Sequence, residues 1–257
     1  MRKILSVLFV LLASVAVFAT TLVGLRQKDL FVIGADSKAT YRGKGIKGPE
    51  TVCKIYQAGR VYFAISGLAD DRNTNFFPGK IVANSFSDNA ASFNSNLQHM
   101  ERALSDSLAT EMTRLKARDR DAFDQTQKDE GDTVAVLAAE MEGDHPVMGG
   151  AGFRYVDGTA PSIVVHGSIC PGDCPGDKDG VFYGGHYESA QKMAMEFYKS
   201  HRTVTRPTKF VRGLVEAEIR SSSEEVGPPI TILRVDKSGP HWILNDSGCP
   251  IVVVPGQ

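Results

Sequence analysis

The alternation of apolar and polar positions predicts strands near both ends of the chain. Residues 21–25 and 30–35 are β-rich runs separated by four polar side chains, which predicts a hairpin. Residues 51–56 and 61–65 flank a short turn and predict a second hairpin. Further strands are predicted in the second half of the chain, at residues 133–139, 162–166, 230–235, 241–244 and 250–254.

Three segments have apolar residues at every third or fourth position, which is the spacing of one helix face. The longest run consists of Leu97, Met100, Leu104, Leu108, Met112 and Leu115. Residues 187–199 and 208–220 show the same spacing, whereas the charged stretch 118–131 is expected to be an exposed loop or a frayed helix end. Because the strands are grouped in hairpins and the helices are grouped separately, we expect an α+β chain with antiparallel sheets.

The first nineteen residues have the pattern of a secretory signal peptide. Two basic residues are followed by an apolar run, and small side chains at Val17 and Ala19 precede Thr20. An uncleaved membrane anchor is less favoured, because the run is shorter than the roughly 20 residues that a membrane span needs. We therefore expect a signal peptide at 1–19, a single domain at 20–257, and a secreted or periplasmic protein without a stable membrane anchor.

The composition narrows the class of protein but does not indicate a function. Apolar residues make up 42% of the 257 residues and charged residues 23%, which is enough for a large core and excludes a disordered chain. The 29 basic and 30 acidic residues give a net charge of −1, so no nucleic-acid partner is expected. The cysteines and the six histidines show no metal-ligand spacing, so no metal is expected.

The four cysteines are too few for a disulfide scaffold. Cys170 and Cys174 lie in one short loop, and a local disulfide between them fits an exported protein. Cys53 and Cys249 could pair with each other or remain buried thiols, and their spacing does not decide between these alternatives.

Removal of residues 1–19 would place Thr20 at the amino terminus. Its α-amine would titrate near pH 8 and would lie within reach of its own hydroxyl, directly or through one water, so one residue could supply both nucleophile and base. Three further positions accompany it: Asp36 after an apolar strand, Lys54 within an otherwise apolar predicted strand, and Gly67 where a strand gives way to a loop or helix.

In order and spacing these motifs resemble the β-type catalytic subunits of the proteasome and their bacterial relatives, which are N-terminal nucleophile hydrolases. The mature chain would begin Thr-Thr, residues 35–40 read Ala-Asp-Ser-Lys-Ala-Thr, and residues 51–54 read Thr-Val-Cys-Lys. Sixteen residues separate Thr20 from Asp36, as in the family, whereas a start at Thr21 would give fifteen. The resemblance is clear from residue 20 to about residue 71. It implies a four-layer αββα sandwich with two packed antiparallel sheets.

The resemblance also implies a role for each of four residues. Thr20 Oγ would attack a peptide carbonyl, Lys54 would place a positive charge beside that hydroxyl, and Asp36 would pair with Lys54. The backbone N–H of Gly67 would donate to the oxyanion. The alternatives are structural: a turn cap at Asp36, a solvent-facing side chain at Lys54 and a simple strand terminator at Gly67.

The same resemblance sets expectations for substrates and assembly. Ala39, Val52, Ile65 and Ala69 fall where the family lines its substrate pocket, and because all four are apolar we expect a preference for uncharged side chains. The implied substrate is a peptide or an unfolded protein, and no cofactor is needed. Relatives assemble into rings, so a homo-oligomer is expected.

The chain departs from the family at two places. Tyr183 stands where active members carry a serine. Active members also have an Asp-x-x-Ser pair, and the nearest segment in this chain is residues 221–227, which include Glu224. Two alternatives to a peptidase therefore stay open. One is an amidase of the same superfamily acting on small acyl-amides, and the other is a catalytically inactive structural subunit.

Overall fold

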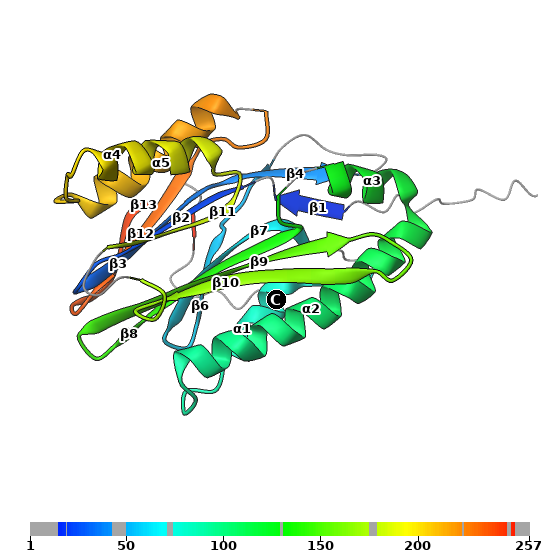
Figure 1. The fold of residues 1–257 in the computed structure, drawn as a ribbon, viewed down its shortest axis with the longest axis horizontal. Coiled ribbons are helices and arrows are strands. Elements are labelled where there is room, and N and C mark those ends of the chain that lie inside the picture. The colour runs from blue at the N-terminus through cyan, green and yellow to red at the C-terminus, as the bar shows by residue number, and fades with distance from the viewer. Residues whose placement is uncertain are drawn as a thin grey trace, which may run out of the picture.

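The computed structural model describes residues 15–18, 20–42, 50–70, 74–128, 131–174, 179–222, 224–245 and 248–249, with backbone alone at 15–18, 40–42 and 69–70. Two antiparallel sheets lie face to face in the middle, and helices cover both outer faces (Figure 1). This four-layer αββα arrangement confirms the predicted fold class.

The first sheet has eight strands. Its order along the hydrogen-bonded path is β10 (Ser162–Cys170), β9 (His145–Val156), β8 (Val134–Glu142), β7 (Val61–Asp70), β1 (Val15–Phe18), β4 (Lys38–Arg42) and β5 (Glu50–Thr51). The eighth strand, β6 (Ile55–Ala58), pairs with the first half of β7, and β1 pairs with its second half.

The second sheet has five strands, in the order β11 (Gly180–Gly185), β2 (Thr21–Arg26), β3 (Leu30–Asp36), β12 (Ile230–Asp236) and β13 (Gly239–Asn245). All residues of β2 and β3 are buried, since one face of the sheet packs on the first sheet and the other on helices. Apolar side chains from both sheets meet in the middle layer, among them Phe31, Leu137, Met148 and Phe182.

Helices α1 (Pro78–Ser85), α2 (Phe93–Arg118) and α3 (Arg120–Lys128) cover the first sheet, and α4 (Glu188–Lys199) and α5 (Pro207–Ser221) cover the second. The α2 helix begins after Ser92, whose hydroxyl accepts a hydrogen bond from the Ser95 N–H at 3.2 Å. The apolar face predicted for it is buried throughout. None of the helices in the described residues is long and apolar enough to cross a membrane.

Two element predictions are wrong. The charged stretch after α2 contains α3, because Phe123 and Ala122 give it a buried face and the Phe123 ring packs edge-on against Tyr155 at 5.9 Å. Residues 51–56 are not one strand, because the chain leaves the edge of β4 after Thr51 and joins β7 only at Ile55. Helix α1 and strands β1, β4, β9 and β11 were not predicted as elements, and β1 falls within the expected signal peptide. The strand predicted at 250–254 lies outside the described residues.

All four cysteines are in disulfides. Cys170 pairs with Cys174, as expected, and Cys53 pairs with Cys249, which decides the alternative that the sequence left open. The second bridge joins positions 196 residues apart and ties the end of the described chain to the residue before Lys54.

Replacing both Cys53 and Cys249 with serine should lower the free energy of unfolding by about 2–4 kcal/mol, because the bridge restricts the unfolded chain over a long loop. Thermal unfolding of the oxidised protein and the double variant would measure this. The matched control is the Cys170→Ser, Cys174→Ser pair, whose loop is only four residues long. A larger loss from the control pair than from the long-range pair would contradict the prediction.

Candidate active site

Thr20 lies between β1 and β2, fully buried where the two sheets approach each other. Its carbonyl oxygen accepts a hydrogen bond from the backbone N–H of His186 at 2.9 Å. Its hydroxyl is also buried and makes no hydrogen bond to any described residue. An unsatisfied buried hydroxyl is costly in a core and is common at reactive centres.

The carboxylate of Asp36, at the end of β3, is held by four described donors. Oδ1 accepts from the Thr21 N–H at 2.9 Å and from Lys54 Nζ at 3.1 Å. Oδ2 accepts from the Lys38 N–H at 3.2 Å and from the Gly227 N–H at 3.0 Å. The β2–β3 hairpin supplies the first of these contacts, because its register sets Leu22 opposite Ala35. Asp36 is thus more than a local turn cap.

Lys54 lies in the irregular link between β5 and β6, not inside a strand as predicted. Its side chain is fully buried, and Nζ donates to Asp36 Oδ1 at 3.1 Å and to the Lys38 carbonyl oxygen at 2.5 Å. Burial lowers the pKa of Lys54 from 10.5 to about 8, and the Asp36 charge opposes that shift. One carboxylate oxygen therefore joins the Lys54 ammonium to the amide that directly follows Thr20.

Gly67 lies within β7 and does not end it. Its backbone has φ = +88°, and a Cβ at this position would overlap the Thr133 carbonyl oxygen. That carbonyl accepts from the Leu68 N–H at 2.8 Å, which fixes the irregular backbone at this point. Phe18 of β1 is the partner of Gly67 in the sheet register, one residue from the Ala19–Thr20 bond.

Replacing Gly67 with alanine should lower kcat/KM by about 10²–10³-fold, because the added methyl group would displace the amide expected to donate to the oxyanion. A peptide hydrolysis assay would measure this. The control is Gly143→Ala, which also has a positive φ but has open space around the Cβ position. Equal losses in the two variants would show that backbone strain alone accounts for the effect.

Strand β1 fills a gap between two other strands. Val17 pairs with Thr40 of β4 on one side and with Leu68 of β7 on the other, both antiparallel. If residues 1–19 were removed, β4 and β7 would each expose an edge toward this gap. An extended peptide can occupy such a gap by main-chain hydrogen bonding.

The predicted pocket residues are only partly brought together. Ala39 on β4 and Ile65 on β7 are both buried on the strands that flank β1, and Ile65 packs toward the α1–α2 layer. Val52 is half-buried after β5. Ala69 is on β7, but its side chain lies outside the described part of the chain.

Tyr183 does not face Thr20. It is half-buried among the residues under α4 and α5, and its ring stacks on Tyr187 with 5.8 Å between centroids. The residues that contact Thr20 from this turn are Gly185 and His186. Gly185 has φ = +71°, and a Cβ there would overlap the Thr20 carbonyl oxygen.

Sequence reasoning missed three side chains around this turn. The Ser66 hydroxyl is buried next to Gly185 and has no hydrogen-bond partner in the described residues. His186 Nε2 lies 3.1 Å from the Glu225 carboxylate. Glu225 stands two residues before Gly227, the Asp36 donor, so this contact joins the two turns that contact Thr20 and Asp36. The only indication of this contact in the sequence is the presence of a titratable residue in each of the two turns.

The chain is similar to known proteins over the segment that holds this site. Residues 17–113 match the family model described as the proteasome subunit. The resemblance to proteasome subunits is confirmed over that segment. It contains Thr20, Asp36, Lys54 and Gly67, which are the residues that form the buried site.

Among solved structures, Anbu from Hyphomicrobium sp. strain MC1 is similar at 14% identity and a TM-score of 0.46, with 88% of each chain covered. No curated protein matches the chain.

Proposed function

We propose that the protein is a threonine-type peptidase whose nucleophile is Thr20, made amino-terminal by removal of residues 1–19. The observation that carries the proposal is the buried Lys54–Asp36 ion pair, which shares one carboxylate oxygen with the amide after Thr20. An ion pair without solvent access is costly unless it is fully hydrogen-bonded, and here the carboxylate has four donors.

The proposed reaction gives each of these residues the role that the resemblance to proteasome subunits implies. Thr20 Oγ attacks the peptide carbonyl, and its proton passes to the Thr20 α-amine, directly or through a water. The Lys54 charge favours loss of that proton, and the Gly67 N–H donates to the oxyanion. The C–N bond breaks as the departing amine takes the proton, which leaves an ester on Thr20. Water then hydrolyses the ester and restores the hydroxyl, and no cofactor takes part.

The proposed substrate is an extended peptide with uncharged side chains before the cut bond. The gap occupied by β1 offers main-chain partners on β4 and β7, and the flanking Ala39 and Ile65 are apolar. A peptide library assayed with protein that begins at Thr20 would test this. Cleavage only after acidic or basic residues would contradict the substrate preference.

Hydrolysis should decline as the pH rises above about 8, because Lys54 then loses the charge that favours Thr20 deprotonation. The contribution of this group to stability should change in the opposite direction. Its pKa is lower in the folded protein, so between about pH 8 and 10.5 the unfolded chain binds the proton more tightly and the free energy of unfolding rises. Rates and denaturant midpoints measured from pH 6 to 10.5 would check both trends, and activity still rising at pH 10 would contradict the first.

Parallel assays would separate the proposal from its two rivals. Hydrolysis of casein or peptide fluorophores favours a peptidase, hydrolysis of small acyl-amides alone favours an amidase, and neither activity favours a structural subunit.

Export and assembly form part of the same proposal. We propose that signal peptidase cuts after Ala19 and that the mature protein is secreted or periplasmic and assembles with copies of itself. Two disulfides fit an oxidising compartment. Amino-terminal sequencing of the exported protein should give Thr20 as the first residue, and a monomer by light scattering would contradict self-assembly.

A further inference from the structure

A cavity of about 240 Å³ is lined by residues that are neighbours in sequence of residues contacting the candidate active site. It lies where the start of α4 and strand β11 meet strands β9 and β10. Its polar lining includes Asp132, His166, Ser168, Tyr187 and Gln191.

Two residues that line this cavity directly adjoin, in sequence, residues that contact the Thr20 site. Tyr187 follows His186, whose N–H donates to the Thr20 carbonyl. Asp132 precedes Thr133, whose carbonyl accepts from the amide next to Gly67.

The sheet register gives the separation between the two sites. Ser66 pairs with Ala135, Ala135 with Gly152, and Gly152 with His166, so these four residues form one row across β7, β8, β9 and β10. Neighbouring strands are about 4.8 Å apart, which places His166 about 14 Å from Ser66. An extended peptide covers this distance with about four residues.

The charged group in the cavity is the Asp132 carboxylate. Its side chain is 11% exposed, and Oδ2 lies 3.3 Å from His166 Nε2, whose side chain is 66% exposed. A Cβ on Gly152 would overlap Asp132 Oδ2, so the glycine leaves the room that the carboxylate occupies.

The surroundings of Asp132 suit a cation. Burial raises the pKa of Asp132, whereas the charges of His166 and Arg154 lower it. Tyr187 lines the same cavity, and burial raises its pKa, with the Asp132 charge contributing to that shift. A shielded carboxylate beside an aromatic ring offers both an ion pair and a cation–π contact. Because His166 is largely exposed, a stronger cation can replace it as the partner.

The path of a bound peptide past Thr20 explains how this cavity could contact the substrate. The place of β1 accommodates the part of a peptide before the cut bond, and strand β2 of the protein itself continues from Thr20. The part of the peptide after the cut bond therefore needs another path. We propose that it passes the turn at His186 and that a basic side chain on it binds in the cavity, with Asp132 as the ion partner and Tyr187 as the aromatic contact. This inference rests on the proposed peptidase function, because it names the peptides that the Thr20 site prefers.

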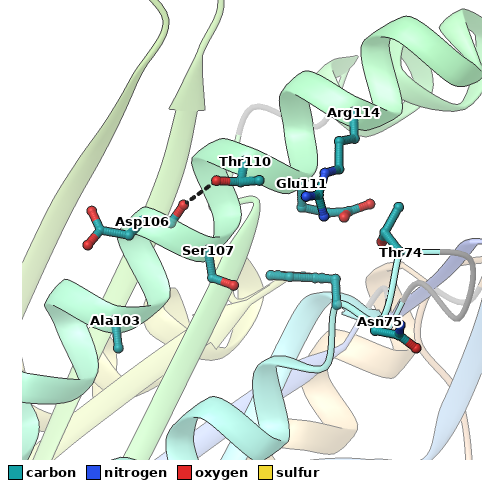
Figure 2. Close-up of a pocket in the computed structure, with 9 residues that line it drawn as sticks. Thr74, Asn75, Ala103, Asp106, Ser107, Thr110, Glu111 and Arg114 are labelled. Carbon is teal, nitrogen blue, oxygen red and sulfur yellow. Dashed lines mark hydrogen bonds between the residues drawn. The ribbon is translucent and has the colours of Figure 1, made fainter.

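A second cavity supplies a matched control. It has a volume of about 460 Å³ and lies between α2 and residues 74–76, on the helix-covered face of the first sheet. Figure 2 shows Glu111 and Arg114 of α2 near Thr74, while the Asp106 carboxylate points away from them. Asp106 is exposed, so Asp106→Asn removes one acidic charge without altering the cavity beside Thr20.

The first experiment compares cleavage of matched peptides by protein that begins at Thr20. Lysine, alanine or glutamate is placed in turn at the first four positions after the cut bond. At one of the second to fourth positions, lysine should raise kcat/KM about tenfold over glutamate. Asp132→Asn should remove this ratio, and Asp106→Asn should preserve it. Equal rates for lysine and glutamate at all four positions would overturn the inference while leaving the peptidase function intact.

The second experiment does not depend on catalysis. Fluorescence anisotropy would measure the binding of peptides to the Thr20→Ala variant. Each peptide has the sequence that follows the cut bond, with lysine or glutamate at the position that the first experiment identifies. If no peptide is cleaved, lysine or glutamate is placed in turn at the second, third and fourth positions. The lysine peptide should bind about tenfold more tightly, and Asp132→Asn should remove the difference. A lysine preference in a protein that cleaves no peptide would support the cavity and contradict the peptidase. Equal affinities would overturn the inference.

Discussion

Replacing Thr20 with alanine should abolish peptide hydrolysis, lowering kcat/KM by at least about 10⁴-fold, because the variant has no hydroxyl next to the amino-terminal amine. Thr20→Ser should keep a measurable rate, because it retains both the hydroxyl and the amine. Initial rates on a peptide fluorophore, measured with both variants beginning at residue 20, would check these expectations.

Two controls separate chemistry from folding. Circular dichroism and the unfolding midpoint should be nearly the same for the Thr20→Ala variant and the parent. A form that carries one extra alanine before Thr20 should also be inactive, since its hydroxyl is present but the α-amine is part of a peptide bond. Full activity in that extended form would show that the amine of Thr20 is not the base.

Replacing Asp36 with asparagine should lower the free energy of unfolding by about 3–5 kcal/mol and eliminate hydrolysis. The change leaves Lys54 buried without its charge partner, and an amide NH₂ cannot accept from all the donors that now surround the carboxylate. Urea unfolding at pH 7 would measure the loss of stability.

A double-mutant cycle would assign that loss to the ion pair. Asp36→Asn combined with Lys54→Met should be less destabilised than the sum of the two single variants, because the second change removes the unpaired charge. Asp157→Asn, which breaks the exposed contact with Lys116, serves as the control and should have a much smaller effect. Additive effects of the Asp36 and Lys54 changes would argue against a coupled pair.

The part of the site that is local in sequence could be predicted, and the part made by distant segments could not. The hairpin of residues 21–25 and 30–35 was predicted from its pattern, and because a two-strand hairpin fixes its own register, that local pairing brings Asp36 to the Thr21 amide. Gly227 reaches the same carboxylate from 191 residues away, and no local pattern encodes that contact. The His186–Glu225 pair is hidden for the same reason.

The helices and strands also divide into those with a clear local pattern and those whose burial depends on distant segments. The α2 helix repeats its apolar residues with helical spacing from Leu97 to Leu115, over about five turns, so its pattern was clear. The α3 helix has few buried side chains, and its burial depends on Tyr155 from a distant strand. The glycines of β9 weakened its strand pattern, although they lie against side chains such as Leu97 and Phe182 in the folded protein.

The most direct measurement is the site of covalent labelling by a threonine-reactive β-lactone, determined by intact mass and peptide mapping. Protein that begins at Thr20 should gain a single acyl group on Thr20, more slowly above pH 9 than at pH 8, and Thr20→Ala should gain none. Acylation at another residue, or equal labelling of the Thr20→Ala variant, would contradict an amino-terminal threonine activated by the Lys54–Asp36 pair.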